Sequence, residues 1–105
     1  MNTLATKLKN VAIELVSTTD DALTVELSDG RTLSVPMLWF PRLFHATVNE
    51  REQWRLVGNG QGIHWQAVDE DISLDNLLFG QPSGESQKSL QKWLNTRQIQ
   101  QTQIV

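Results

Sequence analysis

The sequence predicts a single α+β domain followed by a helical tail. Three observations predict it: strand-type alternation in two hairpins, helix signals between and after them, and a change of composition after Gly80. A chain of 105 residues has room for one hydrophobic core but little for a second. We therefore divide the chain into a small domain, residues 1–80, and a linker with a C-terminal helix, residues 81–105.

A three-stranded antiparallel meander is expected at the start of the domain. Residues 11–17 and 22–28 are rich in aliphatic and β-branched side chains, and the second run alternates as a half-buried strand does. Asp29-Gly30 separates this run from residues 31–35, which also alternate. Asp-Gly between alternating runs is typical of a type I′ hairpin turn, in which both central residues have positive φ.

Short helices are expected to follow the meander. Apolar residues recur at helical spacing over residues 38–44. Thr47-x-x-Glu50 is a capping box, in which each side chain bonds the other residue's backbone amide. It indicates a second short helix that runs through Trp54.

A second β-hairpin and a third short helix complete the predicted domain. Two short extended runs, residues 55–57 and 63–65, enclose the glycine-rich segment 58–62, which favours a hairpin. Ser73 is a suitable N-cap for a helix that ends at Gly80, where glycine readily takes the left-handed conformation of a C-cap.

The tail is predicted to contain one helix, from about Ser86 to Arg97. Its apolar face consists of Leu90, Trp93 and Leu94, too few to hold an isolated helix of this length in water. We therefore expect it to pack on its own domain, on a second copy to give a homodimer, or on a partner.

Charge and composition exclude several classes of function. Residues 1–80 carry six Lys/Arg and eleven Asp/Glu, whereas residues 81–105 carry three and one. An acidic domain argues against nucleic acid as its partner, because such binding rests largely on neutralisation of phosphates. No cysteine, no membrane-length apolar run and no apolar segment after Lys7 and Lys9 are present. We expect a cytoplasmic protein with no membrane partner.

Residues 58–80 hold most of the side chains that could carry chemistry. His64 precedes an acidic cluster of Asp69, Glu70 and Asp71, and such groups can bind a divalent metal or act as acid and base. The spacing matches no metal signature, and acidic residues before a helix also stabilise its dipole. The glycines precede a strand, which favours a turn over a phosphate loop. We therefore predict no catalytic residue, metal or cofactor.

The aromatic residues favour an exposed surface for protein binding. Five large aromatics fall within residues 39–65, and although Trp65 is expected to anchor the core, a small domain need not cover them all. Phe40 is out of phase with its helix, so we expect it to be partly exposed beside Arg42, Arg51 or Arg55, as in interface hot spots. The alternative is a solvated helix face with weak, exchangeable ion pairs among Glu50, Arg51, Glu52 and Arg55. The predicted interaction surface comprises Phe40, Arg42, His64, Asp69, Glu70, Asp71 and Trp93.

Six short motifs follow one another between about residues 11 and 80. They are Asp29-Gly30, Pro41-Arg42-Leu43 through Ala46-Thr47, Trp54, Gly62-Ile63-His64-Trp65, Asp69-Glu70-Asp71-Ile72-Ser73 and Leu77-Leu78. In this order they resemble a widespread bacterial family of small domains of unknown function. The resemblance implies a compact α+β fold. In some members it implies the front half of a helix-turn-helix protein, and in others a regulatory role paired with a neighbouring small protein. It supplies no catalytic residues.

These observations favour a non-enzymatic interaction or regulatory module that binds a protein partner. Two alternatives stay open. The first is a nucleic-acid-associated regulator, which the resemblance and the tail residues Lys88, Lys92 and Arg97 suggest. The second is a metal-assisted or acid–base enzyme centred on His64 and Asp69–Asp71.

Overall fold

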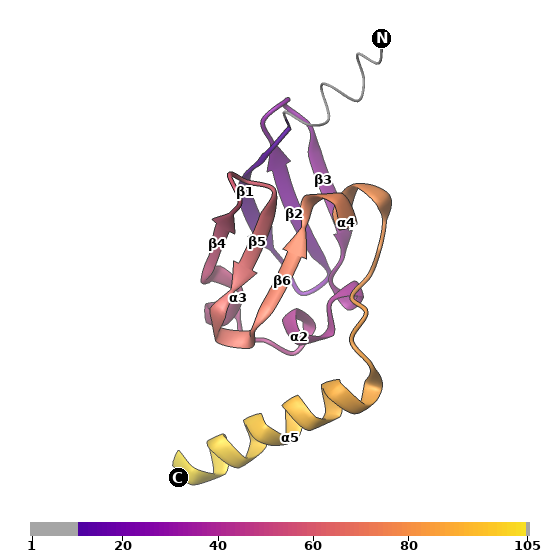
Figure 1. Ribbon diagram of the computed structural model, residues 1–105. Helices are drawn as coiled ribbons and strands as arrows, with labels where there is room; N and C mark the ends of the chain where they lie inside the picture. Colours follow the sequence, from indigo (N-terminus) through magenta and orange to yellow (C-terminus); the bar gives the residue numbers. More distant parts are fainter. Residues whose placement is uncertain (1–10, 105) are drawn as a thin grey trace.

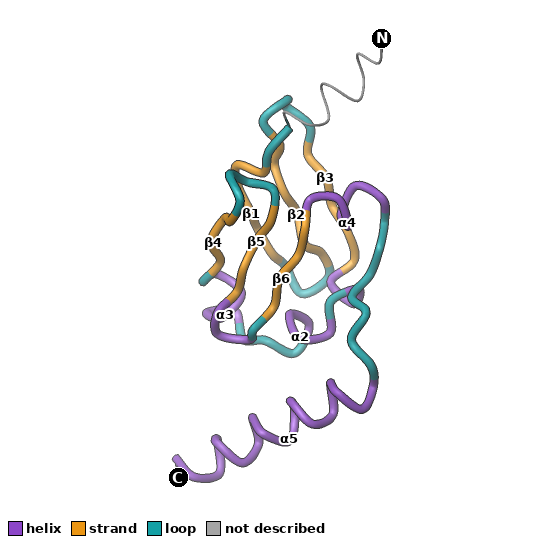
Figure 2. Tube along the Cα trace, viewed as in Figure 1, coloured by secondary structure: helices purple, strands orange, loops and turns teal. Residues whose placement is uncertain are grey.

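Residues 11–104 contain two three-stranded antiparallel sheets, short helices and one long C-terminal helix (Figures 1 and 2). The computed structural model describes residues 11–104. Residues 1–10, where the sequence predicts no export signal, and Val105 lie outside the described residues. The predicted α+β class is confirmed. Across residues 11–104, no helix is long and apolar enough to cross a membrane.

The first sheet is the predicted meander. Strands β1 (Ile13–Thr18), β2 (Ala22–Leu27) and β3 (Thr32–Pro36) pair in sequence order, each antiparallel to the next. The alternation predicted for β2 is present, because every second residue of the strand is buried and the residues between are more exposed.

The turn between β2 and β3 differs from the predicted type. Gly30 has a φ of 93°, but Asp29 is not among the residues with positive φ. The Gly30 amide donates to the Leu27 carbonyl at 3.0 Å, and the Leu27 amide donates to the Arg31 carbonyl at 2.8 Å. This is a three-residue loop with a glycine bulge, in which only the glycine needs the left-handed region.

The second sheet contains the predicted hairpin and one further strand. Strands β4 (Trp54–Val57) and β5 (Gly62–Trp65) form the hairpin. The 3₁₀ helix η2 (Gln66–Val68) leads into β6 (Glu70–Ser73), which pairs with β5. Sequence reasoning missed β6, because a four-residue strand with a single buried side chain, Ile72, has no readable alternation.

The glycine-rich loop of this hairpin joins the two sheets. The Ile13 amide of β1 donates to the Gly60 carbonyl at 2.8 Å, and Gly60 has a φ of 83°. A Cβ atom at Gly60 would lie 2.8 Å from the Ile13 carbonyl oxygen, which is too close for any side chain. The loop therefore needs glycine for a close backbone approach as well as for its turn.

The helical segment after β3 is divided in two. The 3₁₀ helix η1 (Met37–Trp39) and helix α2 (Pro41–Phe44) are separated by Phe40, which has non-helical φ and ψ of −128° and 84°. Helix α3 (Val48–Glu52) begins with the predicted capping box. It stops short of the predicted end at Trp54, which belongs to β4.

The last two helices follow the predicted start signals. Helix α4 (Leu74–Phe79) is capped by the Ser73 side chain and ends at Gly80, which has a φ of 68°. Residues 81–86 form no helix or strand. Helix α5 (Gln87–Ile104) runs on past its predicted end at Arg97.

The hydrophobic core includes residues from both sheets and from η1, η2, α2 and α4. Trp65 is fully buried, and its indole N–H donates to the Arg51 carbonyl at 3.0 Å, so the prediction that it anchors the core is confirmed. Every buried member of this cluster lies between Val11 and Leu77. From α5, Leu90 is buried separately and Trp93 packs against the edge.

The expected partial exposure of Phe40 is wrong. Phe40 is only 2% exposed, whereas Leu38 and Phe44 of the same segment are 69% and 40% exposed. The prediction assumed one continuous helix. The non-helical backbone at Phe40 changes the phase of the segment and directs its ring into the core.

Candidate functional site

Five of the six remaining predicted interaction residues form two groups in the structure, and Glu70 lies beside Trp65. His64 and Asp71 lie side by side on β5 and β6. Arg42, Asp69 and Trp93 gather where α2, the η2–β6 turn and α5 approach one another.

The His64–Asp71 pair is a cross-strand contact near the surface. The two residues are register partners, and His64 Nδ1 lies 2.7 Å from Asp71 Oδ1. The Asp71 side chain is 71% exposed and that of His64 is 18% exposed. Within the described part of the chain, no group of three or more His, Cys, Asp or Glu residues is placed to hold a metal ion. The pair offers at most two ligands.

Glu70 differs from its acidic neighbours in its surroundings. It is half-buried beside Trp65, its register partner on β5, and burial raises the pKa of its carboxyl. Glu70 also accepts a hydrogen bond of 3.0 Å from the Asp71 amide. Asp69, which has a left-handed φ of 51°, points largely into solvent. The acidic cluster is thus spread over different environments instead of converging on one point.

Arg42 is the centre of the second group. Its guanidinium Nε and Nη2 donate to the Glu85 carboxylate at 2.7–3.0 Å, and its Nη1 donates to the Val68 carbonyl at 3.2 Å. Asp69 lies 4.0 Å away. The hydrogen bonds to Glu85 raise the pKa of Arg42 and lower the pKa of Glu85. This contact ties the linker before α5 to α2.

The Trp93 ring contacts two guanidinium groups. The Arg42 and Arg97 guanidinium carbons lie 5.2 Å and 4.7 Å from its centroid, within the range of cation–π attraction. Arg97 donates to both carboxylate oxygens of Glu50 on α3, at 2.8 and 3.0 Å. These hydrogen bonds raise the pKa of Arg97 and lower that of Glu50. We call these residues, Arg42, Glu50, Glu85, Trp93 and Arg97, the tail clamp.

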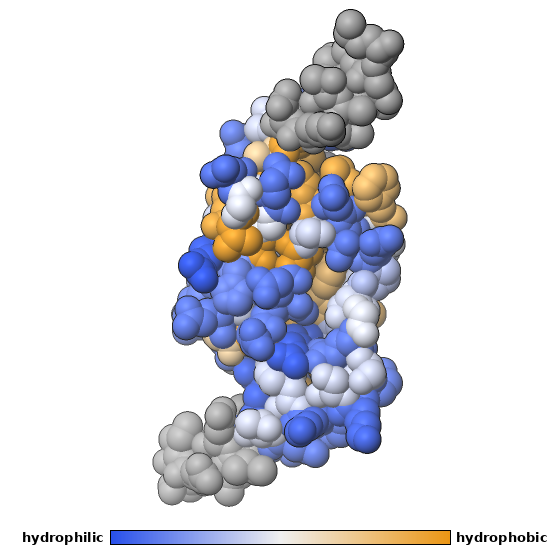
Figure 3. Space-filling view, in the orientation of Figure 1, coloured by the Kyte–Doolittle hydropathy of each residue, from blue (hydrophilic) through white to orange (hydrophobic). Residues whose placement is uncertain are grey.

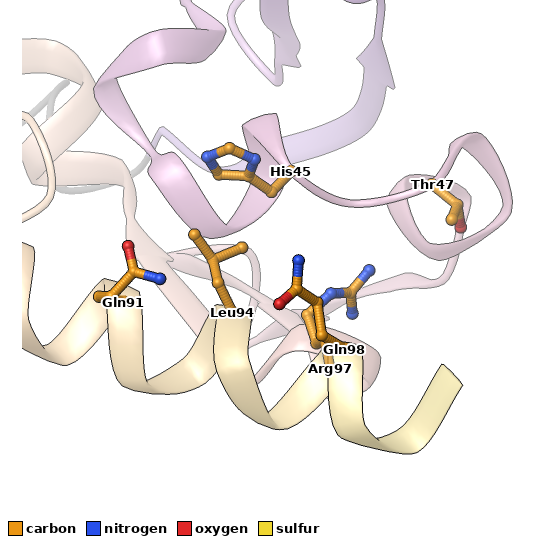
Figure 4. A pocket seen from close by; sticks show the side chains of 6 residues that line it. All are labelled: His45, Thr47, Gln91, Leu94, Arg97 and Gln98. Carbon is orange, nitrogen blue, oxygen red and sulfur yellow. The ribbon is translucent and has the colours of Figure 1, made fainter. Parts of the chain in front are cut away.

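A groove lies between α5 and the end of α2. Its volume is about 400 Å³, and Leu94 of α5 points toward His45 across it (Figure 4). The Phe44 ring packs edge-on against the His45 ring, with the two centroids 5.2 Å apart. The lining residues are His45, Thr47, Gln91, Leu94, Arg97 and Gln98.

Both interpretations of the aromatic segment placed Arg51 at the surface, either beside an exposed aromatic or on a solvated helix face, and that placement is wrong. Its side chain is 6% exposed. Its Nε and Nη2 donate to the carbonyls of Leu43 and Phe44 at 2.9 Å each, and Nη1 donates to Asp20 at 2.8 Å. Arg51 therefore bonds two C-terminal carbonyls of α2, a part of the helix where internal partners are lacking; the Leu43 carbonyl also accepts from the Ala46 amide at 3.1 Å. Nothing in its sequence spacing indicates this role.

Sequence reasoning also missed the two carboxylates of the tail clamp. Glu85 is the only acidic residue of residues 81–105, which is the one signal that could have drawn attention to it. Glu50 was recognised as half of the capping box, and the structure shows the same carboxylate bonding both the Thr47 amide and Arg97.

The fold of this chain is similar to those of two solved structures. A crystal structure of a protein of unknown function from Rhodospirillum rubrum is similar with a TM-score of 0.62 and 23% identity, over 72% of this chain and 94% of that one. A solution structure of an uncharacterised protein from Chromobacterium violaceum has a TM-score of 0.63 and 18% identity, over 87% and 84% of the two chains. No curated protein sequence matches significantly.

The match to a family model identifies the family of the chain, whereas the solved structures show only its fold. Residues 12–83, well over half of the chain, match the family described as "Protein of unknown function (DUF2442)". This range contains all six strands and ends before α5. The resemblance to a bacterial family of unknown function is thereby confirmed, and the chain belongs to the DUF2442 family.

Proposed function

We propose that this protein is a non-enzymatic interaction module that binds a protein partner. One observation carries the proposal. Leu38 and Phe79 are large apolar residues that are 69% and 73% exposed. Leu38 precedes Trp39 in the chain and Phe79 precedes Gly80. These two neighbours lie close together, because a Cβ atom at Gly80 would be 3.6 Å from the Trp39 ring. We call Leu38, Trp39 and Phe79 the apolar strip. Figure 3 shows hydrophobic residues at the surface beside α4.

An apolar strip of this kind favours a protein as the ligand. Exposed apolar side chains that gather at one place mark interaction sites, whereas isolated ones are ordinary. Trp39 is only partly buried, and tryptophan is enriched in interface hot spots. The net charge of −5 over residues 1–80 opposes binding of nucleic acid by the domain.

Affinity purification of the tagged full-length protein, expressed at its native level, tests the proposal. We expect the wild-type protein to recover a specific protein partner and the L38S/F79S variant to lose it. The L15S variant is the matched control, because Leu15 is also an exposed leucine, at 48%, but lies on β1 and not on η1 or α4. A strictly monomeric protein that recovers no partner contradicts the proposal.

Nucleic acid is the second candidate ligand, because Lys88 and Lys92 lie exposed one turn apart on α5. Arg97 adds little to this pair, since its guanidinium already bonds Glu50. Binding to generic duplex DNA that weakens steeply with salt would support this candidate. A complete lack of mobility shift at low salt would eliminate it.

A further inference from the structure

Strand β3 lies at one edge of the first sheet, with β2 as its single neighbouring strand. Where the two strands meet, the Leu27 amide donates to the Arg31 carbonyl at 2.8 Å. In an antiparallel pair, alternate residues direct their amide and carbonyl groups to the same side. Leu33 and Val35, two and four residues after Arg31, therefore bond β2. The residues between them face the other way.

Thr32 and Ser34 thus direct their amide and carbonyl groups away from β2. Thr24 and Ser34 are register partners whose hydroxyls hydrogen-bond each other, as the closer side chains of a pair without backbone bonds can do. Both Thr32 and Ser34 are exposed. Within residues 11–104, no other group bonds their amides or carbonyls. Each of the two residues offers one free donor and one free acceptor at this edge.

Each of the other three strand edges has a neighbour or an internal partner. The Ile13 amide of β1 donates to the Gly60 carbonyl, and α3 and β4 both contact this strand. The edge of β4 lies beside β1 in turn. On β6, the Asp71 amide donates to the Glu70 side chain at 3.0 Å. Because an unprotected edge can pair with another extended chain, such pairing is expected at β3.

The apolar strip lies beside this edge. Strand β3 runs directly into η1, which carries Leu38 and Trp39, and α4, which carries Phe79, contacts β3. Figure 1 shows α4 beside β3. Leu33 of β3 and Leu78 of α4 are only partly buried against the core. The free backbone groups therefore adjoin a part of the core that the domain itself covers incompletely.

This surface suits a short extended segment better than a second copy of the domain. An interface between two folded proteins takes about 800 Å² from each partner. The three side chains of the apolar strip, none of them fully exposed, offer roughly 400 Å² at most. Neither β3 nor the apolar strip carries a charged side chain, so the matching segment is uncharged where it makes contact.

We propose that the edge of β3 binds an extended, uncharged segment of the protein partner as an additional strand. The segment pairs with Thr32 and Ser34 and places alternate apolar side chains on the apolar strip. In this mode main-chain hydrogen bonds supply affinity, and the contacts of alternate side chains supply selectivity. The inference rests on the proposed function, because it names the kind of partner that the apolar strip binds.

The probe is a peptide selected from a phage-displayed library of random twelve-residue sequences, with the full-length protein as bait. Binding of the synthetic peptide is measured by fluorescence anisotropy. Ser34→Pro removes one outward amide but no bond to β2, and proline is tolerated at such edge positions. Ser34→Ala is the matched control, because it loses the hydroxyl and keeps the amide.

The selected peptides should alternate apolar and uncharged polar residues. They should bind S34P at least about tenfold more weakly than the wild type, whereas S34A should bind them as the wild type does. N-methylation of every second peptide residue provides a test without a protein variant. Methyl groups on one alternate set should abolish binding and those on the other set should not, because only one set of amides faces β3.

Several outcomes overturn the proposal. These are a selection that yields no peptide, equal binding to the wild type and to a folded S34P, and equal effects of the two N-methylated sets. If S34P loses the far-ultraviolet circular dichroism of the domain, the N-methylated peptides decide alone. Self-association of the wild type that S34P loses would make a second copy the occupant instead.

The cellular partner separates this inference from the proposed function. A partner that is lost with L38S/F79S but kept by S34P contradicts strand addition and leaves the proposed function intact. The absence of any recovered partner, together with opposite effects of the two N-methylated sets, contradicts the proposed function alone.

Discussion

The domain core and the tail clamp are held together by different forces. The core buries apolar side chains from five of the six strands, whereas the clamp consists of two arginine–carboxylate contacts and one tryptophan ring. Figure 3 shows the same contrast: hydrophobic residues gather over the sheets, and hydrophilic residues surround the start of α5. Apolar burial responds little to pH, whereas the clamp's charge contacts, whose side chains are 11–20% exposed, respond to pH and to salt as far as solvent reaches them. We therefore expect α5 to undock while the domain stays folded.

The largest expected effect comes from Trp65→Ala. The ring is fully buried and also donates a hydrogen bond to the Arg51 carbonyl, so its loss leaves a cavity. We expect the free energy of unfolding, measured by urea titration, to fall by about 3–5 kcal/mol. Trp93→Ala is the matched control, and it should lower the domain's stability by less than about 1 kcal/mol. Similar losses for both tryptophans would mean that α5 is part of the core.

Arg51→Met tests a polar contact inside the domain. The substitution keeps much of the side-chain volume but removes the donor of the Phe44 carbonyl and one of the two donors of the Leu43 carbonyl, which still accepts from the Ala46 amide. We expect a loss of about 1–3 kcal/mol in the free energy of unfolding. Arg55→Met, at an exposed position of β4, should change stability by no more than about 0.5 kcal/mol. Equal effects at the two sites would show that the Arg51 contacts contribute nothing beyond those of a surface arginine.

The sequence predicted features that depend on neighbouring residues and missed those that depend on the whole fold. The β2 alternation, the capping box at Thr47 and the caps of α4 depend on neighbouring residues, and all three are present. Phe40 and β6 were mispredicted because a single non-helical residue and a four-residue strand with one buried side chain leave no readable local pattern. Local signals therefore predicted most helices and strands, but not which face Phe40 presents to the core and not the last strand of the second sheet.

The clamp lay beyond sequence prediction for a related reason. Arg42 and Trp93 were both picked out as interaction residues, but their separation in the chain concealed that they contact each other. Their carboxylate partners, Glu50 and Glu85, are ordinary surface residue types that only the fold brings into range. Ion pairs between distant segments leave no periodic pattern in the sequence, whereas the burial of one face of a helix or strand does.

Acid should release α5 before it unfolds the domain. The pKa values of Glu50 and Glu85 are lowered by hydrogen bonds from Arg97 and Arg42. A lowered carboxyl pKa means that docking is favoured above the ordinary glutamate pKa, about 4.3, and that this contribution is lost as pH falls through the lowered values. We expect the ¹⁹F signal of fluorotryptophan at Trp93 to change in this range, while that of Trp65 stays native.

Variants of the clamp carboxylates provide the control for this titration. E50Q/E85Q should show the released Trp93 signal already at neutral pH, because neither amide can form an ion pair with an arginine. High salt should shift the wild type in the same direction. Glu70 has the opposite sign, since burial raises its pKa and its ionisation opposes folding as pH increases. A Trp93 signal that changes only together with that of Trp65 would contradict independent release.

The smallest expected effect concerns the His64–Asp71 pair, a polar contact that belongs to the domain but lies at its surface. The two residues are cross-strand partners 2.7 Å apart, and Asp71 is largely exposed. A double-mutant cycle of H64Q and D71N should give a coupling energy of about 0.2–1 kcal/mol in the free energy of unfolding, as is usual for cross-strand pairs. A coupling within this range would mean that polar surface contacts are weak wherever they occur, and that Arg51 differs because it is buried. A coupling well above about 1 kcal/mol would instead assign this exposed pair a stabilising role comparable to that of Arg51, and the contrast between core and surface would fail at this site.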